Sequence, residues 1–405
     1  MAERAAREPE RPMRVVDIIN ASTSADTLLR ERVLAMRAQG IDNHIVCADG
    51  PRIEALRALG IPVHTVDVPR NLHPWKLAVA LAQIAAYLRH TQADVVHTHC
   101  AIPGLIGRLA GRLAGVPVII HTAHGFHFHE ATPWAARIPY LAVEGLCGRV
   151  TDTLLTQSRS DLEQAERFGL GPAGRRHHIG NGIDLTRFRP PASGPRAGAV
   201  PTIICVARFE PVKNHGMLLE AAAILKRGGT PFRLLLVGDG PLRDRYLEQC
   251  RRTGIEREVE FLGYRTDIPE LLAETDIAVL TSLKEGLPRA AIEAMAMGLP
   301  VVATRVPGTR EVVRYGETGL GVEVGDAEGL ASALATEIGD PALRARHGAQ
   351  GRAVALQEFD ERRIVEELRE LYHSRLSAHR RAAPAHPVPG TQRDGLLGTR
   401  VRAQR

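Results

Sequence analysis

The stretch that organises the chain is residues 281–313, TSLKEGLPRAAIEAMAMGLPVVATRVPGTREVV. An apolar run at 276–280 precedes it and predicts a buried strand, and a second apolar run follows at 299–303. Between them, the segment from Pro288 to Gly298 is typical of a short helix. A strand, a helix and a second apolar strand in this order predict part of a parallel sheet.

The loop inside this stretch brings two kinds of group together. Glu285 falls in the loop after the first strand, and Glu293 falls on the first turns of the helix. Pro288 suits the first helical position, and the free amides around it then favour an anion. Those amides belong to Leu287, Arg289 and Ala290. Amides for a diphosphate and carboxylates for hydroxyls suit a sugar nucleotide, although an ordinary strand-to-helix turn with two solvated glutamates has the same pattern.

The composition is that of a globular protein large enough for two domains: 405 residues, 44% hydrophobic and 24% charged. Aromatic residues make up only 4%, so stacking platforms for nucleic-acid bases are not expected. The net charge of +6 agrees with a general bias toward arginine or with an anionic membrane surface as partner. Nucleic acid is disfavoured as a partner, because only the C-terminal tail concentrates the charge.

The cysteines and the N-terminus bear on location. The five cysteines form no C-x-x-C pair, which predicts free thiols in a reducing compartment. The first twelve residues are polar without the apolar core of a signal peptide, and no apolar run approaches the length of a transmembrane helix. We expect a cytoplasmic protein, with peripheral contact to the inner membrane surface left open.

Short apolar runs alternate with helical patterns along both halves of the chain. In the first half we expect strands at 14–19, 45–47, 63–66, 95–97, 118–122, 153–156 and 178–179, with helices near 25–39, 75–90, 103–114 and 134–147. In the second half we expect strands at 202–206, 233–237, 258–262, 276–280, 300–303 and 320–324, with helices near 215–227, 241–253, 268–273, 288–297, 309–314, 327–337 and 341–356. This alternation predicts an α/β fold with two Rossmann-like parallel-sheet domains that face each other across a cleft.

A run rich in Pro, Gly and Ala, residues 188–201, predicts a linker between the two domains. We therefore assign an N-terminal domain to 13–190 and a C-terminal domain to 200–357, followed by an amphipathic helix at 358–378. The tails expected to be disordered are 1–12 and 380–405.

Two cations follow the first strand of the second half. Arg208 comes directly after the strand, and Lys213, one of only four lysines in the chain, precedes the next helix. Both are well placed to clamp a diphosphate and to stabilise it as it leaves, although two ordinary surface cations would look the same.

The next two loops carry glycines and backbone groups. Gly238 and Gly240 allow a close backbone approach, but Arg243 stands where the dinucleotide-binding fingerprint requires a third glycine. After the following strand, backbone groups of Tyr264 and Arg265 are candidates to bind the edge of a base.

Six histidines gather in the first half: His97, His99, His121, His124, His127 and His129. They lack the spacing of a zinc enzyme such as H-E-x-x-H, so we predict no metal site. His124, which follows an apolar strand and precedes Gly125, is expected to face the cleft. There it would accept a hydrogen bond from a sugar hydroxyl or shuttle a proton.

Together these motifs resemble the retaining glycosyltransferases of family four, which have the GT-B fold. The resemblance rests on EGLPRAAIEAMAMGLPVVAT, PGTREVV, VARFEPVKNH, VGDGPLRD, FLGYRTDI, GNGID and the stretch from DVVHTH to HTAHGF. The HTH and TAHGF segments resemble bacterial enzymes that build exopolysaccharide, capsule or other envelope glycans. Residues 20–26 lack the double glycine that many members carry in this loop.

The resemblance implies a role for each motif residue. Glu285 and His124 would lie beside the transferred sugar, Arg208 and Lys213 would neutralise the leaving diphosphate, and Glu293 would hold the ribose. The remaining predicted donor contacts are Gly286, Leu287, Pro288, Gly238, Gly240, Tyr264 and Arg265. No metal or other cofactor is implied. The last helix would cross back onto the N-terminal domain, which would take the acceptor, while the C-terminal domain binds the nucleotide sugar.

The resulting hypothesis is a retaining glycosyltransferase of the hexosyltransferase type. It would move a sugar from a nucleoside-diphosphate sugar, with uridine as the expected base, to a glycan or lipid-linked acceptor in envelope or exopolysaccharide biosynthesis. Two alternatives stay open: a sugar-nucleotide epimerase of the same fold, and an inactive sugar-nucleotide-binding protein. The oligomeric state is also open.

Overall fold

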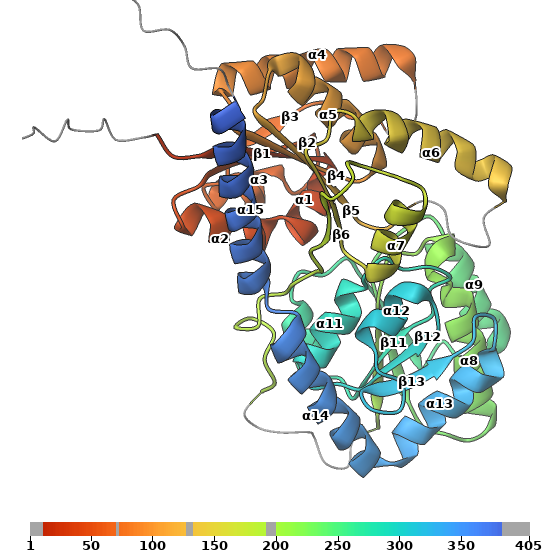
Figure 1. Ribbon diagram of the computed structural model, residues 1–405. Helices are drawn as coiled ribbons and strands as arrows, with labels where there is room; N and C mark the ends of the chain where they lie inside the picture. The colour runs from red at the N-terminus through yellow and green to blue at the C-terminus, as the bar shows by residue number, and fades with distance from the viewer. Residues whose placement is uncertain (1–10, 70–72, 127–132, 192–199, 383–405) are drawn as a thin grey trace, which may run out of the picture.

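The computed structural model of the chain describes residues 11–69, 73–126, 133–191 and 200–382 (Figure 1). Its core is two separate parallel sheets, one in each half of the chain. The first has seven strands in the order β3-β2-β1-β4-β5-β6-β7, and the second has six in the order β10-β9-β8-β11-β12-β13. The predicted α/β architecture of two Rossmann-like units is thereby confirmed.

The strands lie where the apolar runs predict them, except that β7 shares only His178 with the run predicted at 178–179. The first sheet contains β1 (Arg14–Ala21), β2 (Asp42–Ala48), β3 (Val63–Thr65), β4 (Val95–His99), β5 (Val118–Ala123), β6 (Thr153–Thr156) and β7 (Arg176–His178). The second contains β8 (Thr202–Val206), β9 (Arg233–Val237), β10 (Val259–Gly263), β11 (Ile277–Leu280), β12 (Val301–Thr304) and β13 (Gly319–Val322). The strand order reverses between β1 and β4 in the first sheet and between β8 and β11 in the second. In such sheets, ligands bind beyond the carboxyl ends of the strands at the point of reversal.

Helices cover both faces of the first sheet, because alternate residues of each strand point to opposite sides. Val16 and Ile18 pack with α4 (Pro74–Thr91) and α5 (Ala101–Ala114), whereas Val15 packs on the other side, with α2 and the last helix. The other helices of this half are α1 (Ser22–Leu28), α2 (Arg30–Ala38), α3 (Ile53–Ala58), α6 (Trp134–Gly148) and α7 (Arg159–Arg167). The helix predicted at 25–39 is two helices, divided at Leu29, and we did not predict the short α3 and α7.

The second sheet is covered in the same way. One face packs against α8 (His215–Arg227), α9 (Arg243–Thr253) and α13 (Ala327–Gly339). The other face packs against α10 (Ile268–Ala273), α11 (Arg289–Ala296), α12 (Pro307–Val312) and α14 (Pro341–Glu358). A single 3₁₀ turn, η1 (Pro211–Lys213), precedes α8.

The chain crosses between the halves twice, and the two crossings touch at a bridge between Ile183 and Asp360. After the second crossing, α15 (Glu361–Ala382) returns to the first half and lies beside α2 (Figure 1). Its residues Ile364, Val365, Leu368, Tyr372 and Leu376 complete the apolar cluster on that face of the first sheet. The predicted crossing helix is therefore confirmed.

Some boundaries differ from the prediction. Ile183 and Phe188, which we placed in the N-terminal domain and at the start of the linker, belong to the apolar cluster of the second sheet. Arg11, which the prediction placed in the N-terminal tail, pairs with Asp94 at 2.9 Å. At the other end, α15 continues to Ala382, past the predicted start of the C-terminal tail at residue 380. The remaining tail residues, 1–10 and 383–405, and most of the linker, 192–199, lie outside the described residues.

Candidate active site

A cavity of about 1340 Å³ lies between the carboxyl ends of the two sheets. The first half contributes the end of β1, including Asn20, the start of α1, and the turn that holds His124. The second half contributes the loops after β8, β9 and β10, with Gly238 and Tyr264, and Glu293 on α11. The structure thus brings residues from both halves of the chain to one site.

The glycines after β9 serve the packing of two loops against each other. A Cβ on Gly238, whose φ is 141°, would lie 2.1 Å from the carbonyl oxygen of Ala207, and one on Gly240 would lie 2.6 Å from that of Phe209. The close backbone approach that the sequence predicts is therefore to the loop after β8. Both glycines also line the cavity, so their backbone is open to a bound ligand there.

Lys213 and Glu285, 72 residues apart in sequence, form a direct ion pair. The Lys213 Nζ donates to Glu285 Oε1 at 2.7 Å, and the Ser282 hydroxyl donates to the same oxygen at 2.5 Å. The two residues follow β8 and β11, which are neighbours in the sheet, so the pair stands at the point where the strand order reverses. Neither side chain is on the cavity wall.

The loop of Glu285 is held between the two halves. A Cβ on Gly286 would lie 2.9 Å from the carbonyl oxygen of His124, and a Cβ on Gly308 would lie 1.8 Å from that of Gly286. Lys284 adds a hydrogen bond from its Nζ to the carbonyl of Phe126 in the first half. We did not predict the parts played by Gly308 and Lys284, although Gly308 stands in the PGTREVV motif.

The start of α11 corrects one prediction. Pro288 does not occupy the first helical position: its φ of −71° and ψ of 101° are extended, and it caps a helix that begins at Arg289. Leu287 is buried in the core of the second half, so only its backbone is available to a ligand. The N-terminus of α11 still faces the cavity, because Arg289 and Ala290 line it.

Glu293 is held by a neighbour that we did not predict. Its Oε1 accepts from the Arg289 Nε at 2.9 Å, and the Arg289 Nη1 also donates to the carbonyl of Gly182 at 3.1 Å. Burial raises the pKa of Glu293 above its ordinary value, and Arg289 opposes this shift. Arg289 therefore orients the carboxylate that we expect to contact ribose.

The other predicted donor contacts lie on the cavity wall. Arg208 has 68% of its side chain exposed and pairs with Glu210 at 2.7 Å. Tyr264 is 49% exposed, with the Arg52 guanidinium of the first half 5.8 Å from its ring centroid. Arg265 bonds through Nε to Asp267 at 2.7 Å. The cavity wall on this side is thus rich in cations.

A chain of hydrogen bonds ends at His124. Asp17 Oδ1 lies 2.7 Å from the His99 Nε2, the His99 Nδ1 lies 3.0 Å from the His124 Nε2, and the His124 Nδ1 lies 3.0 Å from the side-chain amide of Gln157. Burial lowers the pKa of His99 well below its ordinary value and that of His124 to about 4, so both rings are neutral near pH 7.

These contacts fix the tautomers of both rings. Because a carboxylate only accepts, the His99 Nε2 carries the proton and its Nδ1 accepts from the His124 Nε2. The His124 Nδ1 must then accept, which requires the Gln157 side-chain amide to be flipped so that its nitrogen takes the position assigned to Oε1. Both ring nitrogens of His124 are occupied, and a sugar hydroxyl would have to replace Gln157 to be bound there.

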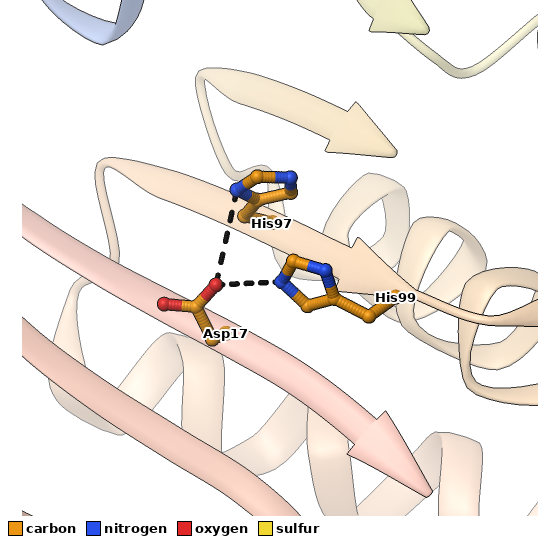
Figure 2. A group of neighbouring side chains, drawn as sticks. All are labelled: Asp17, His97 and His99. Carbon is orange, nitrogen blue, oxygen red and sulfur yellow. Dashed lines mark hydrogen bonds and ion pairs between the residues drawn. The ribbon is translucent and has the colours of Figure 1, made fainter. Parts of the chain in front are cut away.

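Asp17, His97 and His99 form the one three-residue group among the described residues that has the spacing of metal ligands (Figure 2). Hydrogen bonds already engage these atoms: His97 contacts the Tyr372 hydroxyl at 2.6 Å and the Thr122 hydroxyl at 2.6 Å, and Asp17 Oδ2 accepts from Asn43 at 2.6 Å. The residues therefore fit a buried hydrogen-bond network better than a metal centre. Of the other histidines, His121 bonds to Thr98 at 2.9 Å, and His127 and His129 lie outside the described residues.

Comparisons with known proteins agree with this geometry. A model described as glycosyl transferase 4-like domain matches residues 26–182, and one described as glycosyl transferases group 1 matches residues 200–340. EpsD of Bacillus subtilis is 34% identical over 312 residues, which cover 74% of this chain and 81% of that protein. The UDP-Gal:alpha-D-GlcNAc-diphosphoundecaprenol alpha-1,3-galactosyltransferase of Escherichia coli is 30% identical over 319 residues, 75% of this chain and 81% of that enzyme.

The solved structure of HepE from Anabaena, in complex with UDP and glucose, has the same fold, with a TM-score of 0.77 at 23% identity over 89% of this chain and 100% of that chain. Two facing parallel sheets with the site between them match the GT-B fold of that structure. The chain belongs to the family of group 1, family-four-like glycosyltransferases. The predicted enzyme class is thereby confirmed.

Proposed function

We propose that this glycosyltransferase retains the anomeric configuration of the donor sugar and uses a UDP-sugar. We further propose that its acceptor is a lipid-linked glycan of an envelope or extracellular polysaccharide. Support for the donor and acceptor comes from the E. coli relative, whose name specifies UDP-galactose and a diphosphoundecaprenol-linked sugar. The observation that carries the proposal is the Lys213–Glu285 pair at the reversal point of the second sheet, beside a cavity that both halves line.

The donor diphosphate would lie against the loop after β8 and the N-terminus of α11. Arg208 and Lys213 follow one strand, and the amides at the start of α11 add the positive end of a helix dipole. These groups stabilise the charge that grows on the leaving diphosphate, so they act most strongly in the transition state. The ribose hydroxyls would donate to Glu293, which Arg289 holds in place.

Among the carboxylates that line the cavity, all but Asp239 pair with arginines, and Asp239 accepts a hydrogen bond from the backbone amide of Gly240 at 2.8 Å. Glu144 pairs with Arg108, Glu210 with Arg208, and Glu293 with Arg289. We therefore propose that the acceptor hydroxyl attacks from the side of the leaving group. The new C–O bond forms as the bond to phosphate breaks, the electron pair leaves with the diphosphate, and the diphosphate takes the proton of the hydroxyl. Since the protein supplies the positive charge, no metal or other cofactor is needed.

The test is an assay with UDP-, GDP- and ADP-linked sugars and a polyprenyl-diphosphate-linked glycan, in which nucleoside diphosphate release is measured and the product is examined by NMR. We expect release from a UDP-sugar that depends on the acceptor, with the anomeric configuration retained. A product of inverted configuration would contradict the retaining mechanism, and release only from a GDP- or ADP-sugar would contradict the choice of base.

A further inference from the structure

Exposed apolar side chains are concentrated on three consecutive helices of the first half, α4, α5 and α6. Of the 13 large apolar side chains exposed among the described residues, seven lie on these helices: Trp75, Val79, Leu113, Trp134, Ile138, Tyr140 and Leu146. Both tryptophans of the chain are among them, and Trp75 and Trp134 are 73% and 61% exposed. Each stands in the first turn of its helix.

The exposed side of α6 has no charged residue. Its exposed positions are Trp134, Ala135, Ala136, Ile138, Pro139, Tyr140, Ala142, Gly145 and Leu146. A surface helix of a globular protein ordinarily turns polar residues to water, so this helix is arranged as though its outer side met an apolar medium.

The charge on the three helices has one sign at the surface. Their single acidic residue is Glu144, which is buried and bonded through both oxygens to Arg108, at 3.0 and 3.1 Å. Lys76, Arg89 and Arg112 are exposed. Because α5 packs against both α4 and α6 (Figure 1), these cations and the apolar side chains lie on three adjacent helices, whose exposed side we call the α4–α6 face.

This face continues into the cavity. On α6, Pro139, Tyr140 and Val143 line the cavity, while Trp134 and Leu146 of the same helix are exposed. On α5, Ile102 and Leu105 line it too. Apolar side chains of α5 and α6 therefore line the cavity next to the exposed surface, and the buried Arg108–Glu144 pair joins the two helices beside them.

We propose that the α4–α6 face docks on an anionic lipid bilayer. Tryptophans with neighbouring apolar side chains suit the interface between headgroups and acyl chains, and cations without competing acids suit anionic headgroups. The bilayer is the favoured occupant because the charge is complementary to it and because the face opens into the cavity. The second part of the inference, that a lipid-linked acceptor enters the cavity past the apolar residues of α5 and α6 that line it, rests on the proposed function.

The two tryptophans provide the measurement. With the full chain, the emission of tryptophan should shift to shorter wavelength when vesicles containing phosphatidylglycerol are added, and should not shift with vesicles of phosphatidylcholine alone. Salt should weaken the binding, because cations on the protein contribute to it. Co-sedimentation of the chain with the same vesicles gives an independent reading.

The double variant Trp134→Ser, Ile138→Ser should lower vesicle binding roughly tenfold or more, since it removes large apolar side chains from the surface that enters the interface. The matched control is Leu59→Ser with Leu356→Ser, which changes two apolar residues, 48% and 49% exposed, outside the face. The control should bind vesicles as the wild type does. Equal loss in both variants, or no binding of the wild type to anionic vesicles, would overturn the proposal.

Two further readings separate this inference from its rivals. Sedimentation velocity without lipid should show the same oligomeric state for wild type and the Trp134/Ile138 variant; a dimer that the variant disrupts would identify a second copy as the occupant instead. Calorimetry with UDP-sugar in the absence of vesicles tests the proposed function separately. Vesicle binding without UDP-sugar binding would remove the proposed function and leave the docking surface intact.

Discussion

The two sheets have nearly the same strand order, yet they hold polar groups at their carboxyl ends in opposite ways. In the first half, His99 and His124 are neutral rings tied into buried hydrogen bonds that begin at Asp17. In the second half, the corresponding loops carry cations paired with carboxylates, Lys213 with Glu285 being the most enclosed of those after β8 and β11.

This difference follows from what the loops are made of. Glycines at 238, 286 and 308 bring backbone against backbone in the second half, so amides and cations remain available to an anion. The first half fills the equivalent space with imidazole rings, whose burial prevents them from charging. A shared topology therefore does not fix the chemistry; one wall suits a diphosphate and the other suits uncharged hydroxyls.

The largest expected effect comes from removing a cation in the second half, where Lys213 pairs with Glu285 off the cavity wall. Lys213→Ala should lower kcat about 100- to 1000-fold, because a cation that stabilises developing charge is removed. Lys226→Ala is the matched control. Lys226 also forms an ion pair, with Glu258 at an N–O distance of 2.9 Å, but neither residue lines the cavity. Steady-state kinetics and thermal unfolding of both variants check this prediction. Normal turnover in Lys213→Ala would mean that the cation of the Lys213–Glu285 pair does not serve catalysis.

Glu361, at the second crossing between the halves, is a buried carboxyl group, and burial disfavours its charged form as it does that of the buried histidines. Burial raises its pKa from 4.5 to about 7. The folded state therefore holds a proton that the unfolded state loses above about pH 4.5, and stability from this group falls as pH rises from about 4.5 to 7. Glu361→Gln should remove this fall, so the free energy of unfolding of the variant should gain on that of the wild type across this window.

The gain is at most on the order of 3 kcal/mol, from 1.36 kcal/mol per pKa unit. Urea unfolding at several pH values measures it in wild type and variant. Parallel curves for the two proteins would show that Glu361 is not neutral in the folded state. The histidines give the opposite slope, because the depressed pKa of His124 makes stability rise between about pH 4 and 6.5, but they do so equally in both proteins.

Glu293→Ala should weaken UDP binding roughly ten- to a hundredfold, since hydrogen bonds to a charged acceptor contribute about 1.5–3 kcal/mol. It should change kcat less than Lys213→Ala does. Glu220→Ala, an exposed change on α8 in the same half, is the control. Calorimetry with UDP gives the comparison, and unchanged affinity would remove Glu293 from the ribose role.

Asp17→Asn tests the hydrogen-bonded histidines of the first half, His99 and His124. With the carboxylate gone, the tautomer of His99 and hence that of His124 is no longer fixed, and we expect roughly tenfold lower kcat/KM, as for other residues that position a ring through a neighbour. Nitrogen NMR of the histidines should show the change of tautomer directly. The control is Asp276→Asn, which likewise replaces a carboxylate by an amide. Asp276 accepts a hydrogen bond from the backbone N–H of Thr202 at 2.8 Å, and its replacement should leave the kinetics unchanged. A variant with native tautomers and native activity would show that Asp17 does not act through His99.

The smallest expected effect is none. Treatment with a chelator should leave transfer unchanged, because Asp17, His97 and His99 are engaged by hydrogen bonds and the second half supplies its own positive charge. Activity that is lost with chelator and restored by zinc would show that Asp17, His97 and His99 form a metal centre instead.

Much of the fold could be predicted from the sequence because buried parallel strands are continuous apolar runs. Every predicted run overlaps a strand, but the run at 178–179 shares only His178 with β7, whose residues 176–178 are polar. The errors occurred where the signal is local and weak. The helices α3 and α7 are only six and nine residues long. Pro288 suits both the cap and the first position of a helix, and the sequence does not distinguish them.

The candidate site was less predictable, because its contacts join residues far apart in the chain. The sequence singled out Lys213 and Glu285 separately but contained no signal that they pair. Asp17 was not predicted at all, since a single aspartate within an apolar run has no pattern to mark it. Its partner His99 lies 82 residues away, and only the register of β1 beside β4 brings them together.

The position of α15 has a consequence for synthesis on the ribosome. Val15, Val95 and Ile120, which the chain makes early, are covered by the last helix. At about 5–20 residues per second, the roughly 180 residues between Ile183 and the start of α15 take on the order of 10–40 seconds to translate. For that interval the part of this apolar side that α15 later covers is exposed beside α2, so it is the part of the newborn chain that a chaperone would be expected to protect.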